Sequence, residues 1–591
     1  MTLSRGIAGD REVPAVDRTV NLVRLLRRMA AIRPAELTSL ISQCAGGSPP
    51  EVQQCLKEYG PFAGLVRLAP LFPHGYLDTS GRISASGYAH DYRRELGSLL
   101  RALNYEIPQS PSRASSSVYE SRLDDVVFRE VADARERVGH SSSEDLLERL
   151  FAVYDVAPRL PRLAELTERL KDDIDLSDAV MVAHQHILGT VVSQFESLWD
   201  LGLKPSRTYV VGKPYSTNRA AALYLEHQGC HVRSGLRGYA TGAVLSPADY
   251  QAQNNAALGH FFVRVVKTLP KQRLSRLIVL DDGGLVLAWL NRVTESDLFS
   301  ADEVHLLSKL KVVGVEQTTF GQRVVTRARA EPHSVANSSP TIPVAKVAET
   351  RLKIEKESRL IADSVVHEID AWIRSSNERG RHVQSLSKAS VGVIGYGVVG
   401  SWVCRVLHDI VPRMVVFDKD VRKSSSARAV GYQVVHSLQE LAEQCSVIIG
   451  CTGAPSGVEL DASMLSPGTI LASASSGNYE FAPVFISGGK LARQDLNPEV
   501  APGRPASAFD WVHSIFPVKV KGGVAFVLNG GFPVNFTGAL DPIRAEEIEL
   551  TRCLMVLGVA SALRRVNGVS NFGGEVELAP IDEDVLGDMF D

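Results

Sequence analysis

Long hydrophobic runs and an excess of charge of either sign are both missing from this chain. Its longest apolar stretches, such as residues 413–417 and 446–450, have the length of a strand, far below the roughly 20 residues that a membrane-spanning helix needs. Residues 1–6 lack the basic and then apolar order of a signal peptide. The formal net charge is only −3, with acidic and basic residues interspersed. We therefore expect a cytoplasmic protein that binds neither nucleic acid nor a membrane.

Cysteine pairs are missing as well. The seven cysteines include no C-x-x-C spacing, and their number is odd. Reduced thiols in the cytoplasm are the simplest interpretation, because a disulfide framework uses cysteines in pairs. The lack of closely spaced cysteine ligands also argues against a structural zinc site, so we predict no metal centre.

The length and pattern of the chain indicate an α/β protein of several domains. At 591 residues it is too long for one hydrophobic core. Residues 385–541 have the pattern of a Rossmann domain, and residues 178–345 with 543–575 predict a second α/β domain. Residues 1–150 read as a mainly helical N-terminal extension of unknown role, either a plain appendage or a small winged-helix or partner-binding module.

Short elements can be assigned within the second domain. Residues 179–201 are assigned to one helix, and residues 208–212, rich in β-branched side chains, to a strand. A second helix is predicted at 218–227, with further strands at 277–280 and 310–315. Short strands that alternate with helices predict a largely parallel sheet.

The clearest motif in the chain is a glycine-rich turn between a buried strand and an amphipathic helix. Gly395, Gly397 and Gly400 have the spacing G-x-G-x-x-G in the context that this motif needs. Gly395 permits the tight turn, Gly397 removes the side chain that would block a diphosphate, and Gly400 lets helix and strand pack closely. The free N–H groups at the start of the helix, at Val398 and Val399, would bind the diphosphate.

Asp418 indicates that the dinucleotide is NAD. It follows the next strand, residues 414–417, where a carboxylate can accept hydrogen bonds from both ribose hydroxyls and repels the 2′-phosphate of NADP. Arg422 and Lys423 weaken this preference a little. We therefore predict NAD as the cofactor. The alternative is a Rossmann fold that has lost its ligand.

The order of motifs from residue 178 to 565 resembles the S-adenosylhomocysteine hydrolase (adenosylhomocysteinase) family. The resemblance rests on short segments that follow one another in that family's order. They are His184-Gln-His186, Ser216-Thr-Asn, Leu280-Asp-Asp-Gly-Gly, Gly314-Val-Glu-Gln-Thr-Thr-Phe-Gly, the glycine motif, Gly431-Tyr-Gln-Val, Cys451-Thr-Gly and Pro533-Val-Asn535-Phe. The family implies a homo-oligomeric, NAD-dependent enzyme that transiently oxidises the 3′-hydroxyl of a nucleoside-like substrate. By the same resemblance, residues 385–541 would be its Rossmann NAD-binding domain, and residues 178–345 with 543–575 its substrate-type α/β domain.

The resemblance also implies which residues carry the chemistry. Lys353 and Glu357 match the family's lysine and acid beside the 3′-hydroxyl. His186 matches its substrate-domain histidine, and Asp249 its catalytic aspartate. Each assignment has a plainer alternative: a solvated helix face for the charged pair, a buried core histidine for His186, and a helix N-cap for Asp249.

Five further residues are implied as cofactor contacts. Thr318 and Thr319 would approach the nicotinamide ribose, and Asn535 would face the nicotinamide end. Thr452 and Gly453 belong to a segment of the family's cofactor domain. Together with the glycine motif, these residues make up the predicted NAD site.

Several residues depart from that family, so efficient hydrolysis of adenosylhomocysteine is not expected. Gln317 replaces a glutamate, and Ser475-Ser476 and Leu540-Asp541 stand where the family has histidines. Each lost general acid or base costs about 10²–10⁴-fold in rate. Our first hypothesis is therefore an enzyme that oxidises a hydroxyl of a nucleoside-like or other polar substrate.

Two other hypotheses stay open. The first is a non-catalytic NAD-binding sensor or scaffold whose N-terminal domain binds a protein partner. The second is a hydroxy-acid dehydrogenase of related two-domain fold. It is the weaker of the two, because that family's Arg, Glu and His motifs are not evident after the cofactor domain.

Overall fold

The computed structural model divides into two compact units, residues 1–156 with 503–509 and residues 157–502 with 510–591. Among the described residues, no helix is long and apolar enough to cross a membrane. The described residues are 50–69, 113–234, 247–268, 274–293, 299–329, 341–378, 385–453, 460–478, 480–487, 490–491, 511–566, 571 and 575–590, with single positions between 19 and 46.

The first unit is helical in its described part. Its helices include α3 (Pro50–Tyr59), α4 (Pro61–Leu68), α6 (Arg113–Val138) and α7 (His140–Tyr154). Leu65 and Phe128 are among the side chains buried in its core. At the start of α4, the backbone N–H groups of Phe62 and Ala63 donate to the carboxylate of Glu130, and burial raises the pKa of this carboxyl to about 8. The mainly helical N-terminal region expected from the sequence is confirmed.

In its described residues, the second unit has two sheets of seven strands each and a short two-stranded sheet of β12 (Ile486–Ser487) and β13 (Lys490–Leu491). The strands of the first sheet are β1 (Ala179–Ile187), β2 (Thr208–Thr217), β3 (His231–Ser234), β4 (Arg276–Asp281), β5 (Lys311–Glu316), β6 (Thr341–Lys346) and β16 (Glu575–Ala579). All of them run parallel, in the order β16-β6-β5-β4-β1-β2-β3. The strand β16, at the edge beside β6, was not expected from the sequence.

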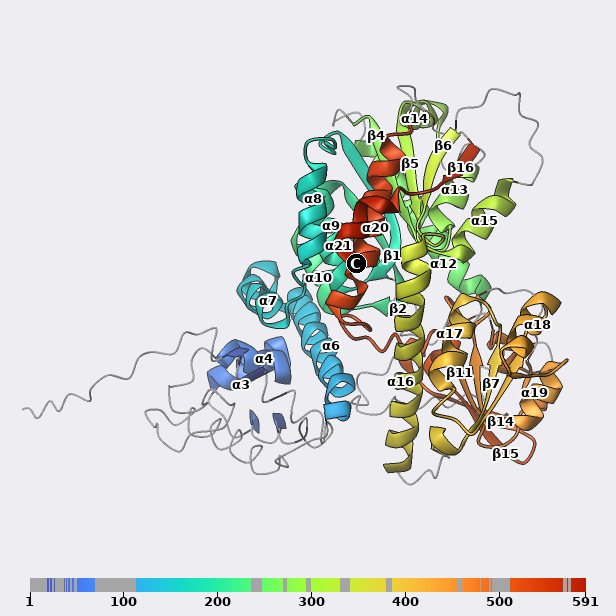
Figure 1. The fold of residues 1–591 in the computed structure, drawn as a ribbon. Helices are drawn as coiled ribbons and strands as arrows, with labels where there is room; N and C mark the ends of the chain where they lie inside the picture. The colour runs from blue at the N-terminus through green and yellow to red at the C-terminus, as the bar shows by residue number, and fades with distance from the viewer. Residues whose placement is uncertain are drawn as a thin grey trace, which may run out of the picture. The chain divides into compact units, whose positions relative to one another are not determined.

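Helices cover both faces of the first sheet, as Figure 1 shows. They are α8 (Pro161–Leu170), α9 (Gly189–Asp200), α10 (Arg219–His227), α12 (Pro247–Thr268), α13 (Leu285–Val293), α14 (Ala301–Leu307), α15 (Thr319–Arg329) and α20 (Ala545–Leu563). Val180 and Val182 of β1 pack with side chains of α12 and α13, whereas Val315 of β5 lies against Gly558 of α20. Strands buried on both faces need continuous aliphatic runs, which is the composition of β1, β4 and β5.

One expectation for this domain was wrong. Residues 179–201 do not form one helix, because β1 ends at Ile187 and α9 begins at Gly189. The first part of this segment is apolar throughout because it is a central strand, and periodicity alone does not separate such a run from a buried helix. His184 and His186 therefore lie at the carboxyl end of a strand, where parallel sheets place their ligand-binding residues.

The second sheet has the Rossmann order. Its strands are β7 (Ser390–Ile394), β8 (Arg413–Phe417), β9 (Gln433–Val434), β10 (Val447–Gly450), β11 (Ile470–Ser473), β14 (Phe516–Val520) and β15 (Gly523–Val527), and its helices include α17 (Val398–Leu407), α18 (Val421–Ala429) and α19 (Leu438–Gln444). The order β9-β8-β7-β10-β11 is the 3-2-1-4-5 arrangement of a dinucleotide-binding domain, and only β14 pairs antiparallel. The predicted fold class is confirmed: α/β, with a Rossmann NAD-binding domain, a second α/β domain and a helical N-terminal region.

A long helix connects the two sheets. After β6 the chain forms the π-helical turn η4 (Lys353–Glu357) and continues as α16 (Ser358–Glu378), which packs against α17. The backbone N–H groups of Arg351 and Leu352, just before this turn, donate to the carboxylate of Glu583 at 2.8 and 2.9 Å. Turns of π-helix are uncommon and often occur at functional sites.

Candidate functional site

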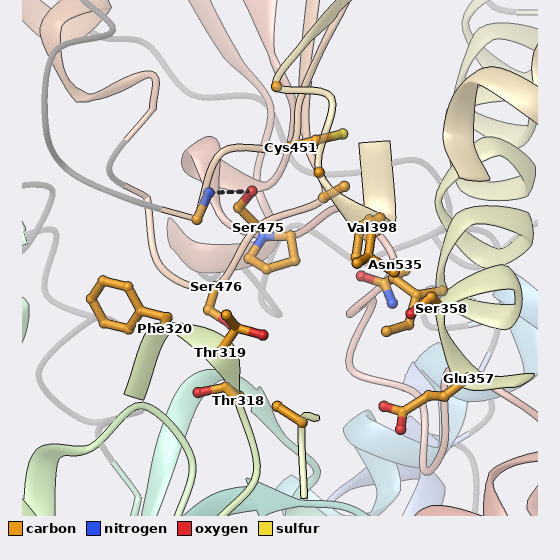
Figure 2. A pocket seen from close by; sticks show the side chains of 18 of the residues that line it. Thr318, Thr319, Phe320, Glu357, Ser358, Val398, Cys451, Ser475, Ser476 and Asn535 are labelled. Atoms are coloured by element: carbon orange, nitrogen blue, oxygen red, sulfur yellow. Dashed lines mark hydrogen bonds between the residues drawn. The ribbon is translucent and has the colours of Figure 1, made fainter. Parts of the chain in front are cut away.

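A cavity of about 730 Å³ in the second unit is lined by residues from both sheets and from η4. From the first sheet it receives the segments that follow β1, β4 and β5, and from the second sheet those that follow β7, β8, β10 and β11. Carboxyl ends of parallel strands are where open α/β sheets bind their ligands. In Figure 2, Thr318 and Thr319 project from one side of this cavity, and Val398, Asn535 and Glu357 lie on the other.

The glycine turn has the shape that a diphosphate needs. Gly395 has a φ of +96°, which favours glycine. A Cβ on Gly400 would lie 1.9 Å from the carbonyl oxygen of Gly395, so helix and strand meet there without room for a side chain. A Cβ on Gly397 would meet nothing nearer than Lys423 Nζ at 4.0 Å, so this backbone is open to a ligand. Val398 and Val399, at the start of α17, line the same cavity.

Asp418 lies directly after β8 and lines the cavity beside the glycine turn. Its carboxylate accepts hydrogen bonds from the backbone N–H groups of Tyr396 at 2.7 Å and Asp420 at 2.9 Å, which fix its orientation. The cations Lys419 and Lys423 also line this end. Lys423 supplies positive charge next to Gly397, where the diphosphate is expected. The sequence pattern had related Lys423 only to the choice between NAD and NADP.

Replacing Asp418 with Ser should weaken NAD binding by roughly 10- to 100-fold, because charge-assisted hydrogen bonds to the ribose are lost. NADP binding should strengthen at the same time, since the repulsion of its 2′-phosphate disappears while the nearby cations remain. The dissociation constants of both nucleotides can be measured by calorimetry. An Asp409→Ser variant, which removes an exposed carboxylate of the same domain, is the control. If the ratio of the two dissociation constants, for NAD and for NADP, were unchanged in the Asp418 variant, this residue would not bind the ribose hydroxyls.

The segments after β10 and β11 are held by a buried carboxyl group. Glu480 accepts hydrogen bonds from the Thr452 backbone and from its hydroxyl, the latter at 2.7 Å, and burial raises the pKa of Glu480. The backbone N–H of Gly453 donates to Ser475 Oγ at 3.0 Å, the bond drawn in Figure 2. Both Thr452 and Gly453 line the cavity. These contacts shape the half of the cavity beyond the glycine turn.

The threonines predicted to approach the nicotinamide ribose lie after β5. Thr318 donates to Glu316 Oε1 through its backbone and its hydroxyl, both at 2.7 Å. Burial, together with nearby aspartates, raises the pKa of Glu316 well above its ordinary value. Thr319 begins α15, and Asn535 is buried at the opposite wall. All three predicted contacts line the cavity, and their binding roles stay predictions.

Lys353 and Glu357 form an ion pair at the edge of the cavity. The Nζ of Lys353 lies 2.9 Å from Oε2 of Glu357, and the side chains are only 13% and 9% exposed. Thr551 of α20 donates a further hydrogen bond to Glu357. The plainer interpretation of a solvated helix face does not apply to this pair. Their neighbours Glu355 and Lys356 do face solvent.

His186 belongs to a buried polar cluster at the carboxyl ends of β1, β2 and β4. Its Nε2 lies 3.1 Å from Asp282 Oδ2, and its Nδ1 is hydrogen-bonded to Ser216. Lys213 pairs with the other oxygen of Asp282. Burial, and then the charge of Lys213, lowers the pKa of His186 to about 4 against the opposing effect of Asp282. The ring stacks on Phe536 at 4.6 Å between centroids and is a neutral imidazole near neutral pH.

The depressed pKa of His186 predicts an acid-dependent loss of stability. The unfolded histidine takes up a proton near pH 6.5, but the folded one does so only near 4. Stability from this group is therefore present above pH 6.5 and lost as the pH falls towards 4, by about 3 kcal/mol in total. Urea unfolding across this range measures the effect. The fall of the free energy of unfolding with pH should be smaller in His186→Gln. It should persist in His305→Gln, which changes an exposed histidine of α14. An equal fall in the wild-type protein and both variants would contradict the assignment.

Two aspartates differ from the sequence interpretation in what the structure shows of them. Asp249 falls in the first turn of α12, but its side chain is outside the described residues, so its assignment stays a prediction. Asp282, by contrast, was quoted in a motif without a role, yet it is fully buried between Lys213 and His186. The sequence does hold a signal for Asp282: it follows a strand directly, in Leu280-Asp-Asp-Gly-Gly, and the carboxyl ends of parallel strands are where site residues lie.

With this geometry established, comparison with known proteins identifies the cofactor domain. Residues 360–455 match the family described as D-isomer specific 2-hydroxyacid dehydrogenase, NAD binding domain. This part of the chain is an NAD-binding domain. The match includes the glycine turn, Asp418 and Thr452.

Other relatives match over various lengths. An uncharacterized protein of Mycobacterium tuberculosis is 28% identical over 62% of this chain, which spans only 61% of that relative's length. The NAD-dependent malic enzyme 1 of Bacillus subtilis is 25% identical over 29% of this chain and 32% of its own. A D-3-phosphoglycerate dehydrogenase oxidoreductase from Ralstonia solanacearum aligns over 67% of this chain and 97% of its own, at 12% identity and a TM-score of 0.33. A phosphoglycerate oxidoreductase from Vibrio cholerae covers 52% and 78%, at 11% identity and a TM-score of 0.27.

The resemblance to adenosylhomocysteinase was wrong. The family that matches the cofactor domain is a dehydrogenase family, and the expected hydrolase activity and nucleoside-like substrate lose the basis on which they rested. The motifs that suggested the resemblance are short, and each has a general structural cause. A glycine turn, an acid after the second strand and polar residues at strand ends are what any two-sheet NAD-binding arrangement requires.

Proposed function

We propose that this protein is an NAD-dependent oxidoreductase that oxidises a hydroxyl group of a small polar substrate in the cavity between the two sheets of the second unit. One observation carries the proposal. The ion pair of Lys353 and Glu357 lines the same cavity as the glycine turn and Asp418, so proton-accepting groups and a dinucleotide site share one cavity. A protein that only stores or senses NAD has no need of such a pair.

NAD, when bound, supplies the acceptor for the hydride that leaves the carbinol carbon. The chain itself must then take up the hydroxyl proton. Lys353 lines the cavity, and its Nζ would contact the substrate hydroxyl. As Lys353 takes the proton of this hydroxyl, it passes one of its own protons to Glu357, whose Oε2 lies 2.9 Å from Nζ. The hydrogen bond from Thr551 holds the carboxylate in place for this exchange. The product is a ketone or aldehyde, and the proton leaves from Glu357 to solvent.

Apolar side chains in the lining of the cavity limit water. Leu188, Phe536 and Ile548 are among them. The hydrogen bond to Ser216, the approach to Asp282 and the stacking on Phe536 fix the ring of His186 in position. The low exposure of the Lys353 and Glu357 side chains strengthens the charge interaction between them.

Hydroxy acids are the substrates to test first. The family that matches residues 360–455 is named for dehydrogenases of 2-hydroxy acids, and one relative is named a malic enzyme. The NAD-loaded protein should form NADH, followed by its near-ultraviolet absorbance, with at least one member of a panel of glycolate, lactate, glycerate and malate. NAD binding without NADH formation from any hydroxy acid or uncharged alcohol would instead favour the non-catalytic alternative.

A further inference from the structure

Arg552 is a buried cation that forms no ion pair with a carboxylate among the described residues. It lies in the middle of α20, is 3% exposed and lines the cavity. Its Nε donates to Thr190 Oγ1 at 3.1 Å, and among the described residues this is the guanidinium's only hydrogen bond. The Nη1 atom is buried with no hydrogen-bond partner in that same part of the chain. Buried polar groups are nearly always hydrogen-bonded, so the unpaired donors call for a ligand.

The surroundings of Arg552 hold it in place without neutralising it. Thr190 binds the carboxylate of Asp541, through its hydroxyl at 2.7 Å and its backbone N–H at 3.1 Å. Asp541 therefore orients Thr190, which in turn orients Arg552. Among the described residues, no acid lies within 4.0 Å of Arg552 in an ion pair. Burial lowers the pKa of Arg552, and the more distant Asp541, Glu357 and Asp282 oppose this effect.

We propose that Arg552 is the anchor for a carboxylate of the substrate, whose hydroxyl lies at the Lys353 and Glu357 pair. This inference rests on the proposed function and adds the substrate class, an anionic hydroxy acid. The guanidinium offers donors in a planar fork that matches the two oxygens of a carboxylate. The family match ends at residue 455, so it assigns no role to Arg552.

The charges around the site favour a carboxylate over a phosphate group. Asp541, Glu357 and Asp282 all interact with Arg552 electrostatically. A singly charged carboxylate meets less repulsion from these acids than a phosphate that carries up to two charges. Inorganic phosphate is therefore expected to bind more weakly than a hydroxy acid.

Binding can be tested without turnover in the NADH-loaded protein, because a hydroxy acid and NADH are both reduced and do not react. Calorimetry should compare glycolate, racemic lactate and malate with their uncharged amides, and with inorganic phosphate. At least one acid is expected to bind roughly 30-fold or more tightly than its amide, as for hydrogen bonds to a charged group. Equal binding of every acid and its amide, no binding of any acid, or tighter binding of phosphate would overturn the proposal.

Variants assign the effect to Arg552. Arg552→Met should lose the preference for the acid, Arg552→Lys should keep part of it, and NADH affinity should change in neither. Arg564→Met, on an exposed arginine just past the end of the same helix, is the matched control and should bind the acid normally. The melting temperature of Arg552→Met without the acid should stay level or rise, since an unpaired buried charge is removed. A lower melting temperature with an intact acid preference would mean that Arg552 is only structural.

The two proposals fail in different ways. Tight binding of an acid that depends on Arg552, without NADH formation from NAD, would remove the oxidoreductase function and leave the anion site. NADH formation from acids and uncharged alcohols alike, unchanged in Arg552→Met, would remove the anion site and leave the oxidoreductase.

Discussion

Replacing Lys353 with Met is expected to lower kcat by roughly 10²–10⁴-fold, the range of a lost general acid or base. The Nζ of Lys353 lies 2.9 Å from Glu357 and lines the cavity, so the variant loses the group that contacts the substrate hydroxyl. NAD affinity should stay unchanged, because the glycine turn and Asp418 are untouched. Steady-state kinetics on a responding hydroxy acid, together with calorimetry of NAD binding, measure the two effects separately.

Lys356→Met is the matched control for this experiment. Lys356 lies in the same π-helical turn and is exposed, where it donates to the carbonyl oxygen of Phe590. Its replacement removes the same charge from the same turn without changing the cavity, and kcat should stay within about two-fold of wild type. A full-rate Lys353→Met enzyme would contradict the proposed proton transfer, as would an equal loss in both variants.

Replacing Gly400 with Ala is expected to weaken NAD binding by roughly 100-fold or more, because the close packing at this point has no space for a side chain. The added Cβ would lie 1.9 Å from the carbonyl oxygen of Gly395, so the turn that holds the diphosphate must move. The free energy of unfolding should also fall by about 1–3 kcal/mol, as in other overpacked sites. Calorimetry with NAD and urea unfolding measure the two effects.

The control for the glycine turn is Gly587→Ala. A Cβ at Gly587 would meet no atom within 4 Å, so this variant should bind NAD and unfold like wild type. If Gly400→Ala bound NAD with wild-type affinity, the diphosphate would have to lie elsewhere, and the assignment of the glycine turn would be lost.

The cofactor half of the site was predictable because its signals are local. Gly395, Gly397 and Gly400 lie within one turn, and each is required by backbone geometry that a short sequence window reveals. Asp418 follows at the end of the next strand, where the fold needs an acid for the ribose. Such residues keep their spacing in any protein of this fold, which is why the fold class was also predictable.

The substrate half was harder to predict because its residues come from distant segments. Arg552 and Asp541 reach the cavity from the last part of the chain and meet Thr190 there. No local pattern marks Arg552 as a site residue within a helix that also carries Glu546, Glu547 and Glu549. Lys353 and Glu357 were found only through a family resemblance that proved wrong, although the structure places the two side chains together in the cavity.

The errors in the sequence interpretation share one physical cause. The apolar first part of residues 179–201 suits a buried helix and a central strand equally well, and only packing decides between them. In the same way, short polar motifs at strand ends suit several families of two-sheet NAD-binding proteins. Their order indicated the architecture correctly and the family incorrectly.

The most direct test of the account is a calorimetric titration of the purified, nucleotide-free chain with NAD. The structure predicts one NAD bound per chain, with weaker binding of NADP because of Asp418, and a loss of binding in Gly400→Ala. A wild-type chain that is folded but binds no NAD would contradict the central claim that the cavity between the two sheets is a dinucleotide site.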